Sequence, residues 1–508
     1  MKTSRYSIAF ILCFLLISCF ANAQNVKAPS VKELAKRVEA SPANLSVHEE
    51  YIKAAADKAS QLKPQYDAWQ KKYPDKAAIS YAIGKALLND NDSTGKGYLL
   101  KAVTIDTNFA PAWQALYMAE LSVDNTKAAQ RYAEKAKSID RKNVQYAFDY
   151  AWAYRNDDQI KFDSLLVDLA ARFPDTEKAA LALCFASQSA YNKAERKAYC
   201  DALLKMDKKE QLPWVNYAFV EYYQDLLTTD AEKAFEVALQ MSLKIKTNRD
   251  LWKKRRQLAR SFLETRRSLK ENRPHDAVAL IDKETIGNSI STTIAFNAEP
   301  VLAMLKAEVY DAAGLTQRAI DTLTAMYTVS PSKAIYDKML NLGQKAGLDS
   351  NAIYNSVKRV LEAKAWAPTD FSLENYADHK KVSLSDFKGK VVLLTFWFPT
   401  CSPCKAEFPH FESVLKNYDR SKVAYLGINL NNSNPELVMP LMANAGYSFI
   451  PLMDAKNQSK GNLPFINSAP TNYLFDGRGR VVFSNFRVDD TNHDMLESML
   501  EILLKMNK

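Results

Sequence analysis

The spacing of apolar residues changes near residue 365. Up to that point, Ala, Leu, Tyr and Trp recur at helical intervals, as in "FAPAWQALYMAEL" and "KAAQRYAEKAKSID". After it, four short runs are almost continuously apolar, which is typical of buried strands, and helical patterns lie between and after them. The predicted strands are 390–398, 422–430, 471–475 and 480–486, and the predicted helices are 402–419, 435–446 and 490–507.

This order of elements predicts two folded regions. Residues 24–365 are expected to form a helical region, and residues 366–508 a three-layer α/β domain with helices on both faces of its sheet. Glycine follows the same division, because seven of the 13 glycines lie in the first 366 residues and six lie in the last 142. The Asp-Gly-Arg-Gly sequence at 476–479 predicts a tight turn that joins the last two strands as a hairpin.

A period of 34 residues runs through part of the helical region. Ala102, Ala136 and Ala170 are 34 residues apart, which is the length of a tetratricopeptide repeat. The sequence at 110–140 resembles a helix-turn-helix unit of that family, and a second such unit is expected at 301–331. We therefore predict a tetratricopeptide-like array with roughly four to seven repeats.

Such an array has a physical reason to stack. Each helical pair buries its apolar face only against its neighbours, so several pairs must assemble before any is stable. The resemblance implies a concave groove that binds a peptide or a partner protein. A scaffold without a ligand of its own is the alternative interpretation.

The N-terminus carries the features of an export signal. Two basic residues, an apolar run at 8–20 and Ala-Asn-Ala at 21–23 predict a signal peptide at residues 1–23. The Leu-Ile-Ser-Cys sequence that ends at Cys19 resembles a bacterial lipoprotein box, in which Cys19 would provide a membrane tether. We therefore expect a protein of the periplasm or cell envelope.

The formal net charge of +10 has a local source. Residues 244–273 hold twelve Lys or Arg against three acidic residues and predict a basic amphipathic helix. In an exported chain, such a helix would face an acidic partner, anionic headgroups or solvent, so no nucleic-acid partner is predicted. The candidates for its packed side are Leu251, Trp252, Leu258, Phe262 and Leu269.

Six cysteines are too few to staple a chain of 508 residues. Two of them, Cys13 and Cys19, lie in the predicted leader. Cys184 and Cys200 occur in successive helical patterns and are interpreted as buried apolar thiols, with a disulfide between them as the alternative. Cys401 and Cys404 remain as the candidates for chemistry.

Cys401 and Cys404 lie between a predicted strand and a predicted helix. At a helix N-terminus, unpaired backbone N–H groups and the helix dipole stabilise a thiolate, so Cys401 is the natural nucleophile and Cys404 the resolving thiol. Zinc would need two further ligands, and the domain offers only the scattered His379, His410 and His493. Haem attachment would need a histidine where Lys405 stands.

A purely structural disulfide is the remaining alternative for this pair, but so small a loop would contribute little stability. A redox pair without metal or cofactor is therefore predicted.

The last 140 or so residues resemble the TlpA/ResA-like branch of the thioredoxin superfamily. The pattern Leu-x-Asp-Phe-x-Gly-Lys at 384–390 is usual in that branch before the first core strand, and "SAPTNYLFDGRGRVVF" matches the stretch with the family's cis-proline. The resemblance implies that Pro470 is this proline, where extended substrates pair with the backbone. It also implies that Pro409 kinks the active-site helix.

The resemblance assigns a role to Glu407 and leaves some positions unusual. Glu407 stands where the branch carries a glutamate that exchanges a proton with the second cysteine, Cys404. Thr395 replaces the buried aspartate of thioredoxin, and Thr400 replaces the usual tryptophan before the first cysteine. The peroxiredoxin pattern needs threonine where Phe398 stands, so peroxidase chemistry is not expected.

The sequence thus predicts an exported thiol-disulfide oxidoreductase that reduces disulfides of periplasmic partner proteins and is served by a redox partner protein. The alternative is a helical-repeat scaffold or binding protein in which the thioredoxin-like domain is a docking module. The direction of electron transfer depends on the reduction potential, which the residues between the two cysteines do not reveal.

Overall fold

The computed structural model describes residues 29–190, 192–207, 213–246, 248–286, 298–454, 461–464 and 468–508. The predicted signal peptide and Cys19 lie outside the described residues. The chain forms two compact units, Met1–Gly95 and Lys96–Lys508.

The first unit is a small helical bundle around an aromatic cluster. Tyr66 and Trp69 are almost fully buried and meet edge to face, with ring centroids 5.1 Å apart. Ser30 caps the first helix with a capping box, which satisfies backbone N–H groups that a helix start leaves unpaired. The helices are α1 (Val31–Ala40), α2 (Leu45–Ala55), α3 (Lys63–Lys72) and α4 (Ala77–Asn89).

The second unit begins with a succession of helices, in which most neighbours in sequence pack against each other. They are α5 (Gly95–Ile105), α6 (Ala110–Ser122), α7 (Thr126–Ile139), α8 (Val144–Trp152), α9 (Gln159–Arg172), α10 (Glu177–Ser189), α11 (Lys193–Met206), α12 (Pro213–Thr229), α13 (Ala231–Lys244), α14 (Arg249–Lys270), α15 (Pro274–Ile281), α16 (Glu299–Ala312), α17 (Thr316–Tyr327), α18 (Lys333–Lys345) and α19 (Ser350–Lys364).

The two segments expected to be repeat units are helical pairs. Residues 110–140 form α6 and α7, and residues 301–331 contain α16 and α17. The alanines of the 34-residue period lie on α5, α7 and α9 and are buried, which suits a small residue between closely packed helices. The helical nature of this region is confirmed, whereas its assignment to the tetratricopeptide family stays a prediction.

Within the described residues, seven strands form one mixed sheet in the order β2-β1-β5-β4-β3-β6-β7. Strands β3, β4 and β5 are parallel, and the others pair antiparallel to their neighbours. Every residue of the central strands β3 and β4 is buried. The strands are β1 (Ser372–Asn375), β2 (Lys381–Ser383), β3 (Val391–Trp397), β4 (Val423–Asn429), β5 (Ile450–Met453), β6 (Thr471–Phe475) and β7 (Val481–Ser484).

Helices cover one face of the sheet. The helices are α20 (Ser402–Leu415), α21 (Pro435–Ala445) and α22 (His493–Met506), and all three contribute to one apolar cluster with Leu393 and Trp397 of β3. The opposite face packs against Phe371, Leu373 and Leu384, from the chain that enters the domain. The expected three-layer arrangement is therefore wrong for the described residues, because this face is covered by the incoming loop and by the short 3-10 helix η2 (Leu384–Phe387) instead of a second layer of α-helices.

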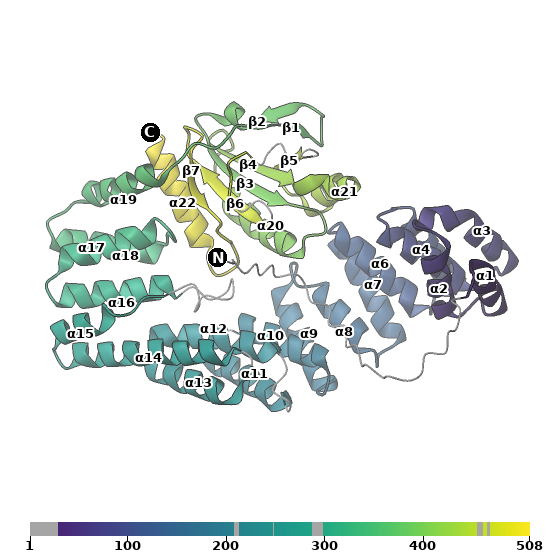
Figure 1. Ribbon diagram of the computed structural model, residues 1–508, viewed down its shortest axis with the longest axis horizontal. Helices are drawn as coiled ribbons and strands as arrows, with labels where there is room; N and C mark the ends of the chain where they lie inside the picture. The colour runs from purple at the N-terminus through teal and green to yellow at the C-terminus, as the bar shows by residue number, and fades with distance from the viewer. Residues whose placement is uncertain are drawn as a thin grey trace. The chain divides into compact units, whose positions relative to one another are not determined.

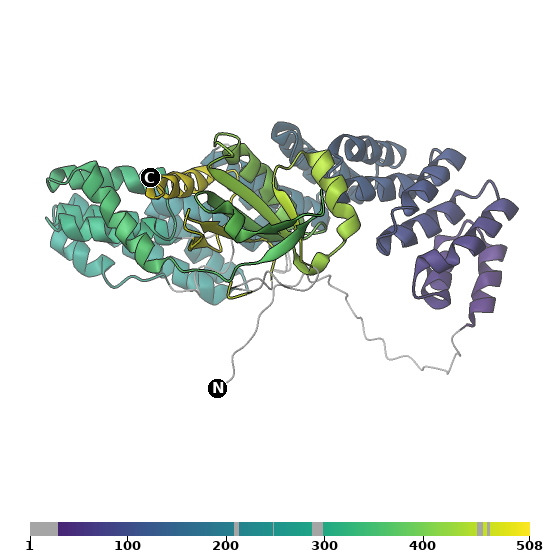
Figure 2. The ribbon, with the colours of Figure 1, turned by 90° about the horizontal axis from the view of Figure 1, so that it is seen from above.

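The end of the helical region shares its hydrophobic core with the α/β domain. Buried residues of α17, α18 and α19 belong to the same cluster as those of α20 and α22. Figures 1 and 2 show these green helices beside the yellow α22. We keep residues 24–365 and 366–508 as proposed domains, although the compact unit from Lys96 to Lys508 spans the boundary between them.

This shared core predicts that a cavity in α19 weakens the α/β domain as well. Leu361 is fully buried in the shared cluster, so Leu361→Ala should cost about 2–5 kcal/mol of unfolding free energy. Hydrogen exchange measured by mass spectrometry should accelerate in α22 as well as in α19. The matched control is Leu243→Ala on α13, where the leucine is 68% exposed. Faster exchange confined to α19 would contradict a common core.

Candidate redox active site

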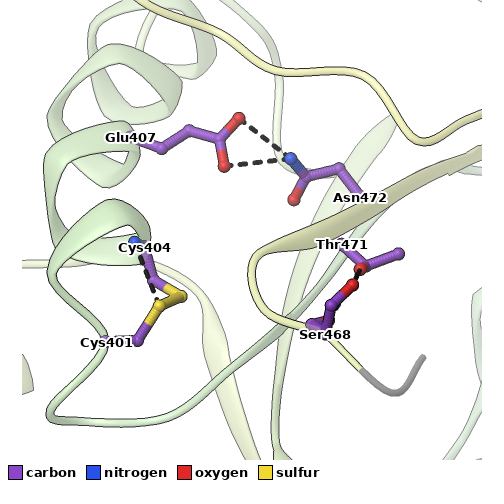
Figure 3. Close-up of a disulfide and its surroundings, with 6 residues drawn as sticks. All are labelled: Cys401, Cys404, Glu407, Ser468, Thr471 and Asn472. Carbon is purple, nitrogen blue, oxygen red and sulfur yellow. Dashed lines mark hydrogen bonds between the residues drawn. A yellow bond between two sulfur atoms is a disulfide. The ribbon is translucent and has the colours of Figure 1, made fainter. Parts of the chain in front are cut away.

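The first cysteine of the pair lies where the central strand turns into α20. Strand β3 ends at Trp397, and Cys401 is the N-cap of α20. Its sulfur accepts a hydrogen bond from the backbone N–H of Cys404 at 3.2 Å (Figure 3). Pro403 occupies the first turn, where its missing N–H costs nothing. The positive end of the helix is therefore directed at the sulfur of Cys401, which favours a thiolate there in the reduced protein.

Cys401 and Cys404 form a disulfide, with their Cα atoms 5.3 Å apart. Cys401 is 3% exposed and Cys404 is fully buried, so Cys401 is the sulfur closer to solvent. This ordering is what an attacking and a resolving thiol require.

The same helix carries a buried carboxyl group on the side that packs against the sheet. Glu407 is 4% exposed and accepts two hydrogen bonds from Nδ2 of Asn472, at 2.9 and 3.0 Å (Figure 3). The backbone N–H of Val488 donates to its Oε1 at 2.8 Å. Burial raises the pKa of Glu407 to about 7, although the Asn472 hydrogen bond, the charge of Arg487 and the Val488 N–H oppose that rise.

Asn472 is a site residue that the sequence analysis did not identify. It is fully buried on β6, opposite Thr395 of β3, and its Nδ2 also donates to the carbonyl of Phe486 at 2.9 Å. The available signal was an amide side chain within the predicted buried strand at 471–475. Its contact with Glu407 joins residues 65 positions apart, so local pattern could not reveal it.

The loop before β6 lies across from the disulfide. The peptide bond between Ala469 and Pro470 is cis, as the resemblance implied. Thr471 donates its hydroxyl hydrogen to the carbonyl of Ser468 at 2.7 Å, which closes the turn around the proline. Figure 3 shows Ser468 and Thr471 on the loop across from the two cysteines.

Trp397 packs in the core under the active site. It is fully buried, and its ring meets those of Phe408 and Phe449 edge to face, with centroids 5.4 and 5.3 Å away. At the rim, Thr400 is exposed and Phe398 is half-buried. The rim of the active site thus has Thr400 at the position where the family usually has tryptophan.

The two other described cysteines are free and buried, so the alternative of a disulfide between them is wrong. Burial raises the pKa of both Cys184 and Cys200 to about 12, which keeps them as unreactive thiols at neutral pH. Their surroundings are apolar helix packing, as predicted.

The predicted basic helix is α14. Trp252, Leu258 and Phe262 are buried as expected, whereas Leu251 and Leu269 are half-buried. Its outer side lines a cavity of about 510 Å³ with α15 and the residues that follow, and the cationic residues there are Lys253, Lys254, Arg256, Arg260 and Lys283. The acidic Glu264 and Glu284 also line it.

The fold and the site together define a class of protein. The disulfide joins two cysteines that are separated by two residues, and it lies at the start of a helix that follows a central parallel strand. A loop with a cis-proline lies opposite. This is the arrangement of a thioredoxin-like thiol-disulfide oxidoreductase.

Comparisons with known proteins agree. The AhpC/TSA family matches at residues 365–484, which is less than half of the chain. The thiol-disulfide oxidoreductase ResA of Bacillus subtilis is 33% identical over 133 residues, covering 26% of this chain and 72% of that protein. The thioredoxin-like protein YneN of the same organism is 31% identical over 135 residues, covering 26% of this chain and 76% of YneN. Through its C-terminal domain, the chain belongs to the ResA family of thiol-disulfide oxidoreductases.

Among solved structures, a putative thiol:disulfide interchange protein DsbE from Chlorobium tepidum is similar to this chain. It is 28% identical, with a TM-score of 0.25, and the match covers 28% of this chain and 97% of that chain.

The buried carboxyl of Glu407 predicts a pH dependence of stability. Its pKa is 4.5 in an ordinary setting and about 7 in the folded chain, so the folded chain binds this proton more tightly than the unfolded chain does. The resulting stability is fully present below pH 4.5 and is lost as pH rises through 7. Between pH 4.5 and 8, wild type should therefore lose about 3 kcal/mol relative to Glu407→Gln. Urea unfolding at several pH values measures this, and parallel curves for the two proteins would contradict it.

Proposed function

We propose that the protein is exported and reduces disulfides of partner proteins in the periplasm or cell envelope. The observation that carries the proposal is the Cys401–Cys404 disulfide at the N-terminus of α20, with the buried carboxyl of Glu407 on the next turn of the same helix. Export is supported by the signal-peptide pattern at residues 1–23, in which Cys19 would supply a lipid tether. Among the described residues, no helix has the length and apolar character needed to cross a bilayer.

In the proposed reaction, the Cys401 thiolate attacks one sulfur of a substrate disulfide. A mixed disulfide forms, and the other substrate sulfur leaves as a thiolate that takes up a proton. Cys404 then loses its proton and attacks the sulfur of Cys401, which forms the intramolecular disulfide and releases the second substrate sulfur. Two electrons pass to the substrate, and a redox partner protein must return them to the oxidised pair.

Glu407 is the proposed proton acceptor for Cys404 in this step and its proton donor in the reverse step. A carboxyl group with a pKa of about 7 can both take and return a proton near neutral pH. The amide donors of Asn472 and Val488 fix its orientation without adding a charge of their own. This arrangement supports proton exchange inside a buried site.

Pro470 is proposed to shape the place where substrate binds. Its loop faces the two cysteines, and an extended polypeptide could pair with the backbone there while its disulfide meets Cys401.

The helical region is proposed to recruit the substrate or another partner through a tetratricopeptide-like groove. The 34-residue spacing and the helical pairs α6–α7 and α16–α17 support this part of the proposal.

Single-cysteine variants give opposite outcomes under this mechanism. Cys404→Ser should accumulate a mixed disulfide between Cys401 and substrate, because the resolving thiol is absent. Cys401→Ser should form none, and the double serine variant should lower disulfide reduction to the uncatalysed background. Non-reducing electrophoresis with mass spectrometry of the trapped species measures both outcomes.

Cys200→Ala serves as the control, since Cys200 is a buried free thiol far from this chemistry in sequence and should leave the rate unchanged. Full biological function in the double serine variant would instead support the scaffold interpretation, in which the helical region does the work.

A further inference from the structure

The turn between α6 and α7 contacts the active-site helix. Lys405, the residue after Cys404, lies with its Nζ 3.0 Å from Oδ1 of Asp124. The same ammonium group donates to the carbonyl oxygens of Leu121 at 2.7 Å and Ser122 at 3.4 Å. The side chains of Lys405 and Asp124 are only 12% and 15% exposed, so this ion pair is largely shielded from water.

Residues at the end of α21 hold the same turn. Tyr447 donates its hydroxyl hydrogen to Oδ2 of Asp124 at 2.9 Å, and Nδ2 of Asn444 donates to the carbonyl of Val123 at 2.9 Å. Asp124 has a φ of +51°, a left-handed conformation that Asp and Asn tolerate better than most residues. The contact is therefore built from several directed hydrogen bonds between segments about 280 and 320 residues apart in the sequence.

We propose that Asp124 is a positioning residue for the redox pair: by holding and neutralising Lys405, it lowers the reduction potential of Cys401 and Cys404. This inference rests on the proposed redox function. It assigns the helical region a direct effect on the chemistry of the active site.

The physical argument concerns the charge beside Cys401. The backbone N–H of Lys405 donates to the carbonyl of Cys401 at 3.1 Å, so the two residues lie one helical turn apart. A nearby cation stabilises a thiolate, and stabilising the thiolate favours the reduced form and raises the reduction potential. The carboxylate of Asp124 offsets that cation, which leaves the helix N-terminus as the main stabiliser of the Cys401 thiolate.

Other charged groups near this helix are the same in the variants that test the proposal. Glu407 is on α20 itself, and Arg487 and Asp489 from the segment after β7 act on its carboxyl. The hydroxyl of Tyr447 donates to Asp124, and its ring packs edge to face against Phe408 of α20.

Two variants break the ion pair from opposite sides. Asp124→Asn removes the negative charge and keeps a residue that accepts the left-handed backbone, so the Cys401 thiolate gains stabilisation. Lys405→Gln removes the positive charge and leaves Asp124 uncompensated, so the thiolate loses stabilisation. The full chain is equilibrated in graded glutathione buffers at one pH, and the thiols of Cys401 and Cys404 are counted by alkylation and mass spectrometry.

We expect the equilibrium constant for reduction to rise about threefold to tenfold in Asp124→Asn and to fall in Lys405→Gln. If the contact only packed the turn, the equilibrium constant would change in the same direction in both variants, and this result would overturn the proposal. An unchanged equilibrium constant in both variants would overturn it as well. The control Asp311→Asn breaks the Lys345–Asp311 ion pair elsewhere in the helical region and should match wild type. If Cys401 and Cys404 of the wild type are never reduced and reoxidised in these buffers, the proposed redox function is wrong. This outcome is distinct from one in which the wild type responds and only the proposed role of Asp124 is wrong.

Discussion

The burial of one carboxyl group constrains the whole active site. Glu407 is on the buried side of α20, and its carboxyl is held by amide donors from β6 and from the segment after β7. Removing a carboxylate from water is costly, so the structure keeps this group protonated until the pH approaches 7. Because the donors come from separate segments, the site forms only when α20 is seated on β6 and on the chain that leads to α22.

The helical region is more than an attachment to this domain. Its last helices share a hydrophobic core with α20 and α22, and the turn after α6 pairs with Lys405 beside the disulfide. The redox site is thus supported at two places by segments that lie outside the family match at residues 365–484. In our account, recruitment of partners and tuning of the disulfide reside in the same helical region.

Elements with strong local pattern were predictable from the sequence. The strand at 471–475 and the start of the helix after Cys401 were predicted to the residue, because apolar runs and the Cys-x-x-Cys context are local signals. The helix ends at Leu415, four residues before the predicted end at 419. Strands β1, β2 and β5 were missed, since they are only three or four residues long and two of them are largely polar. Asn472 and Asp124 were missed for a different reason: each acts on a residue far away in the sequence, and only the fold brings the partners together.

The most direct test of the account is the titration of the Glu407 carboxyl carbon by NMR in the oxidised and the reduced full chain. The account predicts that the pKa of Glu407 is near 7 in the oxidised protein and different in the reduced protein. The reason is that Cys404 titrates only in the reduced protein, where its protonation is coupled to that of Glu407. An ordinary pKa near 4.5 in both states would contradict the proposed proton exchange with Cys404.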